Sequence, residues 1–171
     1  MTNEISKKTA AGVFYASAII LLILDQITKY IARATLTEGR VITVIPNLLE
    51  FKLSFNTGAA FGIMPSWGPL FAIAAILAIY FILRLRHSQP QSKALSIGMG
   101  ILMGGAIGNI IDRIFTPQKA VTDFIAIFIE TSGRRQEWPN FNIADAGIVI
   151  GAIMMIFLIK RNNTTCECKE D

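Results

Sequence analysis

The sequence predicts an α-helical integral membrane protein with four transmembrane helices, a small extracytoplasmic β-sheet and a second extracytoplasmic loop. Hydrophobic residues make up 53% of the 171 residues and charged residues 16%, with a mean hydropathy of +0.52. This composition is too apolar for an ordinary soluble domain of this size. Four long apolar stretches also follow one another, separated by polar segments of very different length. We therefore expect a single membrane domain over residues 1–171.

Each apolar stretch is long enough to cross a hydrocarbon core of about 30 Å, which takes roughly 20 helical residues. The stretches cover residues 10–31, 67–83, 94–111 and 141–159. The first follows two lysines, as the apolar region of a secretory signal peptide does. No cleavage site of small residues ends it, however, and its helical pattern continues through Asp25 and Lys29, so we expect a retained helix.

The positions of lysine and arginine predict the orientation. With four spans, both termini and the short loop 84–93 lie on one side, and the basic residues of that side closely flank the helices. They are Lys7, Lys8, Arg84, Arg86, Lys93, Lys160, Arg161 and Lys169. Loops on the other side are much longer, so their charges influence orientation less. We predict cytoplasmic termini with a cytoplasmic tail at 160–171, and extracytoplasmic segments at 35–66 and 113–140.

The segment 35–66 predicts the small sheet. In LEFKLSF, residues 49–55, leucine and phenylalanine alternate with polar residues, the period of a strand with one apolar face. Pro46 and Asn47 mark a turn between two strand-like runs. Open sheet edges do not occur in lipid, so the sheet should lie at the interface with its apolar face toward the membrane or the helices.

Composition also excludes several classes of partner. The net charge is +4, yet no basic stripe with interleaved aromatic residues indicates a nucleic-acid partner. Cys166 and Cys168 are the only cysteines, so no disulfide framework is expected, and a C-x-C pair alone has too few ligands for structural zinc. We expect no metal or cofactor, and a solvated tail.

Ionisable and amide side chains gather at one predicted level, at the outer ends of three spans. Such groups cost about 2.5 to 3.5 kcal/mol each inside a membrane on insertion scales, and they usually face a bundle interior or a water-filled cavity. They are Asp25, Lys29, Asn109, Asp112, Arg113, Asn142 and Asp145. Within each helix their spacing of three or four residues places them on one face. Asp123 lies in the second outer segment, between apolar residues that could hold it at the membrane surface.

Asp123 and Asp145 are the candidate catalytic pair. Two neighbouring carboxylates cannot both ionise cheaply, so they share a proton. One acid can then deprotonate an attacking water while the other protonates or polarises a scissile carbonyl.

Each of these residues also has a structural interpretation. Asn142 fits a helix N-cap with an acid in the following turn. Asp25 and Lys29 fit an ion pair, and Arg113 fits an interfacial anchor or a partner of Asp112. The glycines of the third stretch fit close helix packing, which would bring Asn109 near another helix.

Other catalytic chemistries lack the residues they need. His87, the only histidine, lies on the predicted cytoplasmic side, and no H-E-x-x-H motif is present. A Ser-Lys dyad is formally available, from Ser54 or Ser66 with Lys29 or Lys52, but no spacing favours it. A proton relay or small transporter is the alternative function, although it would need ionisable groups at successive depths, and the middle of every span is uncharged. A purely structural membrane protein is a third interpretation.

Five motifs occur in a specific order: LDQITKY at 24–30, FNTGAAFGI at 55–63, GGAIGNIIDR at 104–113, VTDFI at 121–125 and FNIAD at 141–145. In order and spacing they resemble the signature blocks of bacterial lipoprotein signal peptidase, also called signal peptidase II or prolipoprotein signal peptidase. The resemblance extends over nearly the whole chain, from the first predicted helix to the fourth.

The resemblance implies a multi-pass aspartyl endopeptidase of the bacterial cytoplasmic (inner) membrane. Such an enzyme removes the signal peptide from a diacylglyceryl-modified prolipoprotein, cutting just before the lipid-modified cysteine. By motif, Asp123 and Asp145 correspond to the catalytic pair. The positions implied to line the substrate site or to support it are Asn56, Asn109, Arg113, Asn142, Asp112, Asp25 and Lys29. The implied partners are the lipidated substrate and membrane lipid, and because one chain carries both acids, a monomer suffices.

Two mild departures from the family pattern are Ala146, where serine is common, and Leu24, where phenylalanine is common. Neither removes an acid or an amide. Residues 130–140, ETSGRRQEWPN, differ from the family pattern more freely. Because a gate beside an active site is commonly a loop, we expect this segment to cover the site.

Overall fold

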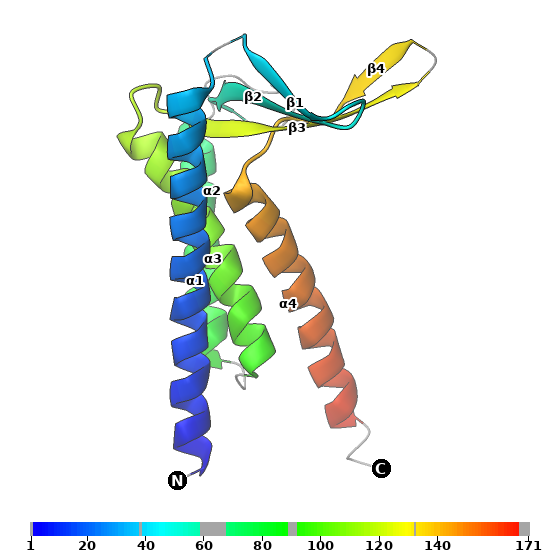
Figure 1. Cartoon of the computed structure of the whole chain (residues 1–171). Helices are drawn as coiled ribbons and strands as arrows, with labels where there is room; N and C mark the ends of the chain where they lie inside the picture. The colour runs from blue at the N-terminus through cyan, green and yellow to red at the C-terminus, as the bar shows by residue number, and fades with distance from the viewer. Residues whose placement is uncertain (1, 38, 59–67, 89–91, 132, 168–171) are drawn as a thin grey trace.

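A computed structural model describes residues 2–37, 39–58, 68–88, 92–131 and 133–167. These residues form a bundle of helices with a small sheet at one end (Figure 1). The helices are α1 (Thr2–Thr35), α2 (Gly68–Ser88), α3 (Lys93–Phe115) and α4 (Ile143–Glu167). The strands are β1 (Val41–Ile45), β2 (Leu49–Asn56), β3 (Val121–Thr131) and β4 (Arg134–Glu137). Helix α1 begins and α4 ends at one end of the bundle, and the sheet lies across the other end (Figure 1).

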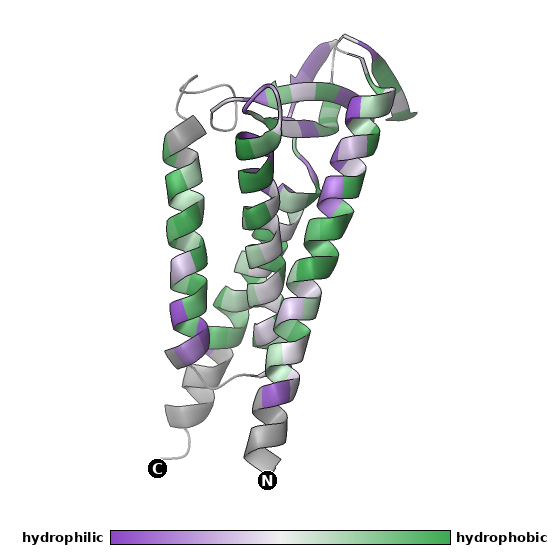
Figure 2. Cartoon of the chain, turned by 90° about the vertical axis from the view of Figure 1, so that its left-hand side faces the viewer, coloured by the Kyte–Doolittle hydropathy of each residue, from purple (hydrophilic) through white to green (hydrophobic). Residues whose placement is uncertain are grey.

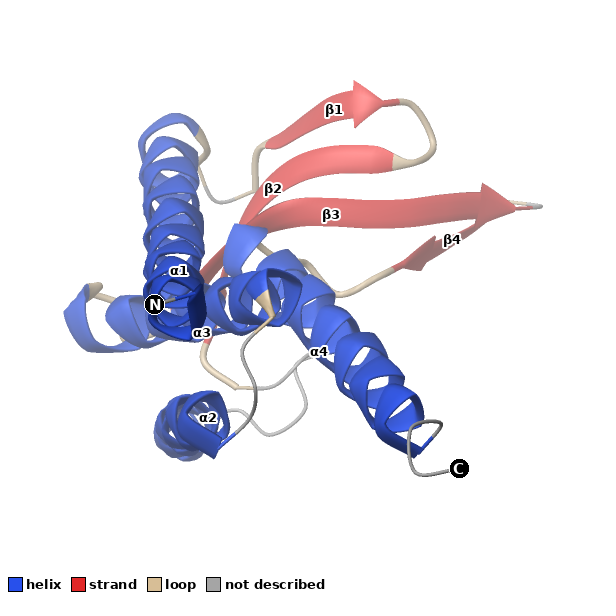
Figure 3. Ribbon diagram, turned by 90° about the horizontal axis from the view of Figure 1, so that it is seen from below, coloured by secondary structure: helices blue, strands red, loops and turns tan. Residues whose placement is uncertain are grey.

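Helix α3 is the central helix of the bundle, packed against α1, α2 and α4 (Figure 3). Glycines permit this packing. A Cβ at Gly104 would collide with the main-chain carbonyl of Ala18 on α1, and one at Gly105 would lie 2.5 Å from the carbonyl oxygen of Ala144 on α4. The predicted close packing of the glycine-rich helix is therefore confirmed.

Three helices within the described residues are long and apolar enough to cross a membrane: Lys8–Thr35, Lys93–Phe115 and Ile143–Lys160. Hydrophobic residues cover the middle of the helices, and hydrophilic residues lie toward both ends of the bundle, at the sheet and at the opposite ends of the helices (Figure 2). The predicted span 67–83 corresponds to α2 and stays a prediction. Trp67, at its expected start, lies outside the described residues.

The helices extend beyond the spans predicted from hydropathy. α1 begins at Thr2 rather than residue 10, and α4 continues to Glu167, so much of the predicted tail 160–171 is helical. Hydropathy marks only the apolar part of a helix. The helix itself continues through neighbouring polar residues for as long as its backbone hydrogen bonds continue. Ser92 and Thr116 show such ends on α3: the Ser92 hydroxyl accepts a hydrogen bond from Leu95 N, and Thr116 N donates to the Asp112 carbonyl.

The sheet is antiparallel, with the strand order β1-β2-β3-β4. The predicted turn between β1 and β2 is confirmed, with Asn47 at φ 60°. The second outer segment is not a loop as predicted, because residues 121–131 form β3, the longest strand among the described residues, which pairs with β2. Its β-branched and aromatic residues suit a pleated surface, but its partner strands, β2 and β4, are brought beside it only by the fold.

At the inner end of the sheet, Leu53 of β2 and Phe124 of β3 are buried with Ala32 of α1 and with Leu36, which directly follows α1. This cluster fixes the beginning of β3 over the ends of the helices. The site residues lie at the same junction.

Candidate active site

The first turn of α4 contains a reciprocal capping pair. Asp145 N donates to Asn142 Oδ1 at 2.9 Å, and Asn142 N donates to Asp145 Oδ2 at 3.3 Å. This is the capping-box arrangement, with a short acid in place of the usual glutamate. The N-cap interpretation of Asn142 is thus confirmed. The side-chain NH₂ group of Asn142 takes no part in this cap and makes a second contact.

That second contact joins α4 to β3. Asn142 Nδ2 donates to Asp123 Oδ1 at 2.7 Å. The segment before α4 pairs with β3, since Ile125 N donates to the Phe141 carbonyl at 2.9 Å and Phe141 N donates to the Ile125 carbonyl at 3.0 Å. This pairing places residue 142 beside residue 123, so both predicted catalytic acids contact the same asparagine.

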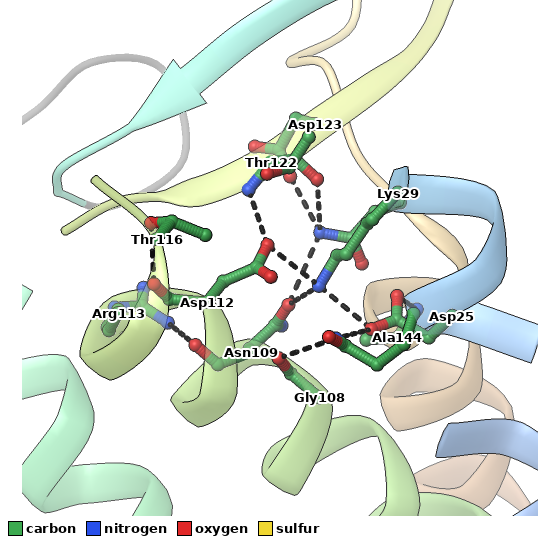
Figure 4. A network of polar contacts seen from close by, with 12 residues as sticks. Asp25, Lys29, Gly108, Asn109, Asp112, Arg113, Thr116, Thr122, Asp123 and Ala144 are labelled. Atoms are coloured by element: carbon green, nitrogen blue, oxygen red, sulfur yellow. Dashed lines mark hydrogen bonds and ion pairs between the residues drawn. The ribbon is translucent and has the colours of Figure 1, made fainter. Parts of the chain in front are cut away.

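Asn109 connects Asp145 to a buried lysine. Its Nδ2 donates to Asp145 Oδ1 at 2.8 Å. Its Oδ1 accepts a hydrogen bond from Lys29 Nζ at 2.9 Å (Figure 4). Because the ammonium can only donate, it fixes the amide with its oxygen toward Lys29 and its NH₂ group toward Asp145.

Lys29 is fully buried between two acids. Its Nζ lies 2.9 Å from Asp25 Oδ2 and 3.4 Å from Asp112 Oδ2, and the side chains of both acids are also buried (Figure 4). Asp25 Oδ1 in turn accepts from Ala144 N in the first turn of α4, at 2.9 Å. The predicted ion pair is confirmed, and it belongs to a cluster that joins α1, α3 and α4.

Asp112 pairs with the cations of α1 rather than with Arg113. Besides Lys29, it lies 3.4 Å from Arg33 Nη1, and it accepts a hydrogen bond from Thr122 N at 2.8 Å. Arg33 also donates to Thr122 Oγ1 at 2.8 Å. Asp112 thus fixes the main chain of β3 immediately before Asp123.

Sequence reasoning missed Arg33 and Thr122. Arg33 lies four residues after Lys29 and eight after Asp25, so it shares their helix face, and that spacing was a usable signal. Thr122 carried no signal of its own, because its role depends on the strand beside α3.

Burial raises the pKa of the Asp123 carboxyl to about 7, and the nearby charge of Asp145 adds to the increase. Hydrogen bonds from Asn56 and Asn142 and the positive charge of Lys29 oppose it. Asp123 is therefore protonated in a large fraction of molecules near neutral pH. A carboxyl with this property beside a second acid can exchange protons with a bound water.

Asn56 and Arg113 complete the set of predicted residues. Asn56 Nδ2 donates to Asp123 Oδ2 at 3.2 Å, so β2 contributes directly to the site. Arg113 Nη1 donates to the carbonyl of Asn109 at 3.3 Å, and its buried Nε has no hydrogen-bond partner in the described part of the chain. The charge of Arg113 interacts with Asp145, Asp123 and Asp112.

The described residues contain no group of three or more His, Cys, Asp or Glu side chains placed to hold a metal ion. Residues 59–63 of the motif at 55–63, and Ser66, lie outside the described residues. Residues 134–137 of the segment expected to cover the site form β4, which pairs with residues 128–131 of β3.

Comparisons with known proteins give a consistent result. The family model described as Signal peptidase (SPase) II matches residues 17–161. A lipoprotein signal peptidase of Geobacillus thermodenitrificans is 35% identical over 146 residues, which are 85% of this chain and 88% of the relative. One from Coxiella burnetii is 34% identical over 163 residues, 91% of this chain and 93% of the relative.

Two solved structures described as bacterial membrane enzymes are similar in fold. One has a TM-score of 0.78 and 32% sequence identity, with 90% of this chain and 91% of the other covered. The second has a TM-score of 0.74 and 33% identity, with 86% and 92% covered.

Proposed function

The chain belongs to the signal peptidase II family, and we propose that Asp123 and Asp145 are the catalytic pair with which it cleaves prolipoproteins. Membership makes the chain a membrane aspartic endopeptidase of lipoprotein processing. Its substrate is a diacylglyceryl-modified prolipoprotein, cut just before the lipid-modified cysteine.

The shared contact to Asn142 is the observation that supports this pair most directly. Asp123 accepts from the Asn142 side chain and Asp145 from the Asn142 main chain, so the two carboxyl groups are held beside one residue. Asn109 holds the other oxygen of Asp145, and Asn56 holds the other oxygen of Asp123. Every carboxyl oxygen thus has a donor that limits its rotation, as catalysis by positioned groups requires.

In the proposed mechanism the pair carries one proton and a water lies between the acids. Asp145 accepts a proton from the water while protonated Asp123 polarises the scissile carbonyl, and the oxygen of the water forms a bond to the carbonyl carbon. Collapse of the tetrahedral intermediate breaks the C–N bond, and the proton taken up by Asp145 passes to the leaving amine. No covalent intermediate with the enzyme forms.

Arg113 has the donors to bind substrate in this mechanism. Its Nε makes no hydrogen bond to the described residues although it is buried, and a buried guanidinium donor costs free energy unless a partner satisfies it. A substrate carbonyl oxygen beside the acids would supply that partner. We assign Arg113 to the substrate main chain near the scissile bond.

The proposed orientation follows from the position of the site. The sheet and the two acids lie at the end of the bundle opposite to the beginning of α1 and the end of α4 (Figure 1). With four spans and cytoplasmic termini, the acids lie on the extracytoplasmic side, where lipoprotein signal peptides emerge from the membrane. One chain carries both acids, so a monomer is sufficient.

The test is cleavage of a diacylglyceryl-modified prolipoprotein by purified Asp123→Asn and Asp145→Asn variants. Each change keeps the size and polarity of the side chain and removes its proton chemistry, so each should reduce kcat by roughly 10²- to 10⁴-fold or more. Glu167→Gln, at the end of α4 opposite to the sheet (Figure 1), is the matched control and should cleave normally. An undiminished rate in either folded aspartate variant would show that the pair is assigned wrongly.

A further inference from the structure

Thr122, the residue before Asp123, is hydrogen-bonded to three helices at once. Its main-chain N donates to Asp112 Oδ2 of α3 at 2.8 Å (Figure 4). Its carbonyl accepts from Nδ2 of Asn142, the N-cap of α4, at 3.3 Å, and its hydroxyl accepts from Arg33 Nη1 of α1 at 2.8 Å. Thr122 is fully buried, so the amide, the carbonyl and the hydroxyl are each held by a different helix.

Pairing within the sheet leaves this part of β3 room to move. The register between β2 and β3 is regular from Ser54 to Asn56, but it shifts between Phe51 and Ser54, immediately beyond Asp123. At such an irregularity the ladder of hydrogen bonds is interrupted and the strand bends. The contacts from the helices to Thr122 therefore limit a movement of the strand that its pairing with β2 permits.

Arg33 makes two contacts of different kinds. It lies 3.4 Å from Asp112 Oδ1, whereas its hydrogen bond to the Thr122 hydroxyl is 2.8 Å long. Balancing the charge of Asp112 requires only the first contact, and Lys29 Nζ already lies 3.4 Å from the other oxygen of that carboxylate. The shorter contact joins the guanidinium to a neutral group. It adds nothing to the charge balance and acts on the position of β3.

We propose that Arg33 is a positioning residue, which through the Thr122 hydroxyl holds Asp123 in place against Asp145 and a bound water. Successive side chains of a strand point to opposite faces, so the Thr122 hydroxyl and the Asp123 carboxyl lie on opposite sides of β3. Arg33 thus acts on the acid through the main chain. A displacement of about 1 Å in a reacting group can cost roughly 10²-fold in rate. This role presupposes the proposed catalytic function of Asp123.

The test is to measure kcat and KM of purified variants on a diacylglyceryl-modified prolipoprotein. Thr122→Val removes the hydroxyl at nearly constant size and keeps the main-chain hydrogen bonds and all charges. Arg33→Met removes the donor. Because the Arg33 side chain is 28% exposed and Lys29 remains beside Asp112, we expect this variant to fold.

Two further variants complete the set. Thr122→Ser keeps a hydroxyl at the same position and is the conservative variant. Thr35→Val is the matched control, because the Thr35 hydroxyl is exposed and donates at 2.8 Å to the carbonyl of Ile31 in its own helix. Thermal unfolding of each variant shows how much of it is folded under the conditions of the assay.

Thr122→Val and Arg33→Met should each lower kcat by roughly 10- to 100-fold, with KM within about twofold of the wild type. The double variant should lose no more than the more impaired single variant, because both changes break one contact. Thr122→Ser and Thr35→Val should keep a kcat near that of the wild type. A merely structural role would lower the unfolding temperature and leave kcat per folded molecule unchanged.

A wild-type kcat in folded Thr122→Val would overturn the positioning role. Losses that multiply in the double variant would also overturn it, since the two residues would then act independently. Asp123→Asn, measured in the same assay, separates this role from the proposed function. If Asp123→Asn is inactive while the Thr122→Val and Arg33→Met variants are normal, only the positioning role fails. If Asp123→Asn is fully active, both fail.

Discussion

Asn142 donates a hydrogen bond from its side-chain amide to Asp123 across the junction between α4 and β3, at 2.7 Å. The same amide uses its oxygen to cap Asp145 N at 2.9 Å. One side chain thus stabilises the start of the helix and aligns the acid on the strand. These two roles can be separated by substitution.

Asn142→Ser should keep most of the capping and lose the contact to Asp123. Serine caps a helix about as well as asparagine, whereas alanine costs about 1 kcal/mol at an N-cap. We expect Asn142→Ser to unfold near the wild-type temperature and Asn142→Ala to unfold earlier, with a large loss of kcat in both. Thermal unfolding in detergent and single-turnover cleavage measure the two effects. Full activity in Asn142→Ser would show that the amide donor to Asp123 is dispensable.

The pKa of Asp123, raised to about 7 by burial and by Asp145, predicts the alkaline side of the pH profile. The protonated acid exists below this pKa and is lost as the pH rises through it. Activity that needs one proton on the pair should therefore fall above about pH 7, approaching tenfold per unit. Steady-state kcat/KM between pH 5 and 10 measures this decline; a profile that stays flat across that range contradicts it.

Asn56→Ala should move that decline to higher pH. Its hydrogen bond to Asp123 stabilises the charged carboxylate and lowers the pKa, so removing the bond raises the pKa. Asn140→Ala is a matched control, because it removes the same type of side chain from a nearby position. The Asn140 amide donates to Ser54 Oγ at 2.9 Å, whereas the Asn56 amide donates to the Asp123 carboxyl. Its profile should coincide with that of the wild type. A shift to lower pH in Asn56→Ala would disprove the role assigned to this bond.

Lys29→Met should strongly destabilise the bundle. The change leaves Asp25 and Asp112 buried without the ammonium that now lies 2.9 Å and 3.4 Å from them. Removing one partner of a buried ion pair typically costs about 3 to 5 kcal/mol. Lys52→Met, at a half-exposed pair with Glu137, should cost less than about 1 kcal/mol.

Combining Lys29→Met with Asp25→Asn should recover part of the loss. The asparagine carries no charge but can still accept the hydrogen bond from Ala144 N. Denaturant or thermal unfolding of the single and double variants measures the recovery. No recovery would mean that packing of the lysine stem, rather than charge balance, dominates at this position.

Gly104→Ala should separate α1 from α3, because the added methyl group would meet the main chain of Ala18. Backbone cannot move aside as a flexible side chain can, so we expect a loss of about 1 to 3 kcal/mol from overpacking. Gly12→Ala is the control on α1, where an added Cβ meets nothing within 4 Å. It should leave the unfolding temperature unchanged or raise it slightly. Equal stability of the two variants would argue against close packing at Gly104.

The sequence by itself determined the membrane character and the apolar stretches, and it named the candidate catalytic and supporting residues. These depend on short windows: hydropathy over about 20 residues, and the one-face spacing of Asn109, Asp112 and Arg113. The ion pair of Asp25 and Lys29 and the cap at Asn142 were predictable for the same reason, since each lies within one helical turn.

Only the tertiary structure decided how these groups meet. The bond from Asn56 to Asp123 joins residues 67 positions apart, and the one from Lys29 to Asn109 joins residues 80 apart. Such contacts depend on the register between β2 and β3 and on the close approach of α1 to α3, and neither is a property of a local window. The same is true of residues 121–131, which the sequence placed in a loop: the strand exists because β2 offers it an edge to pair with.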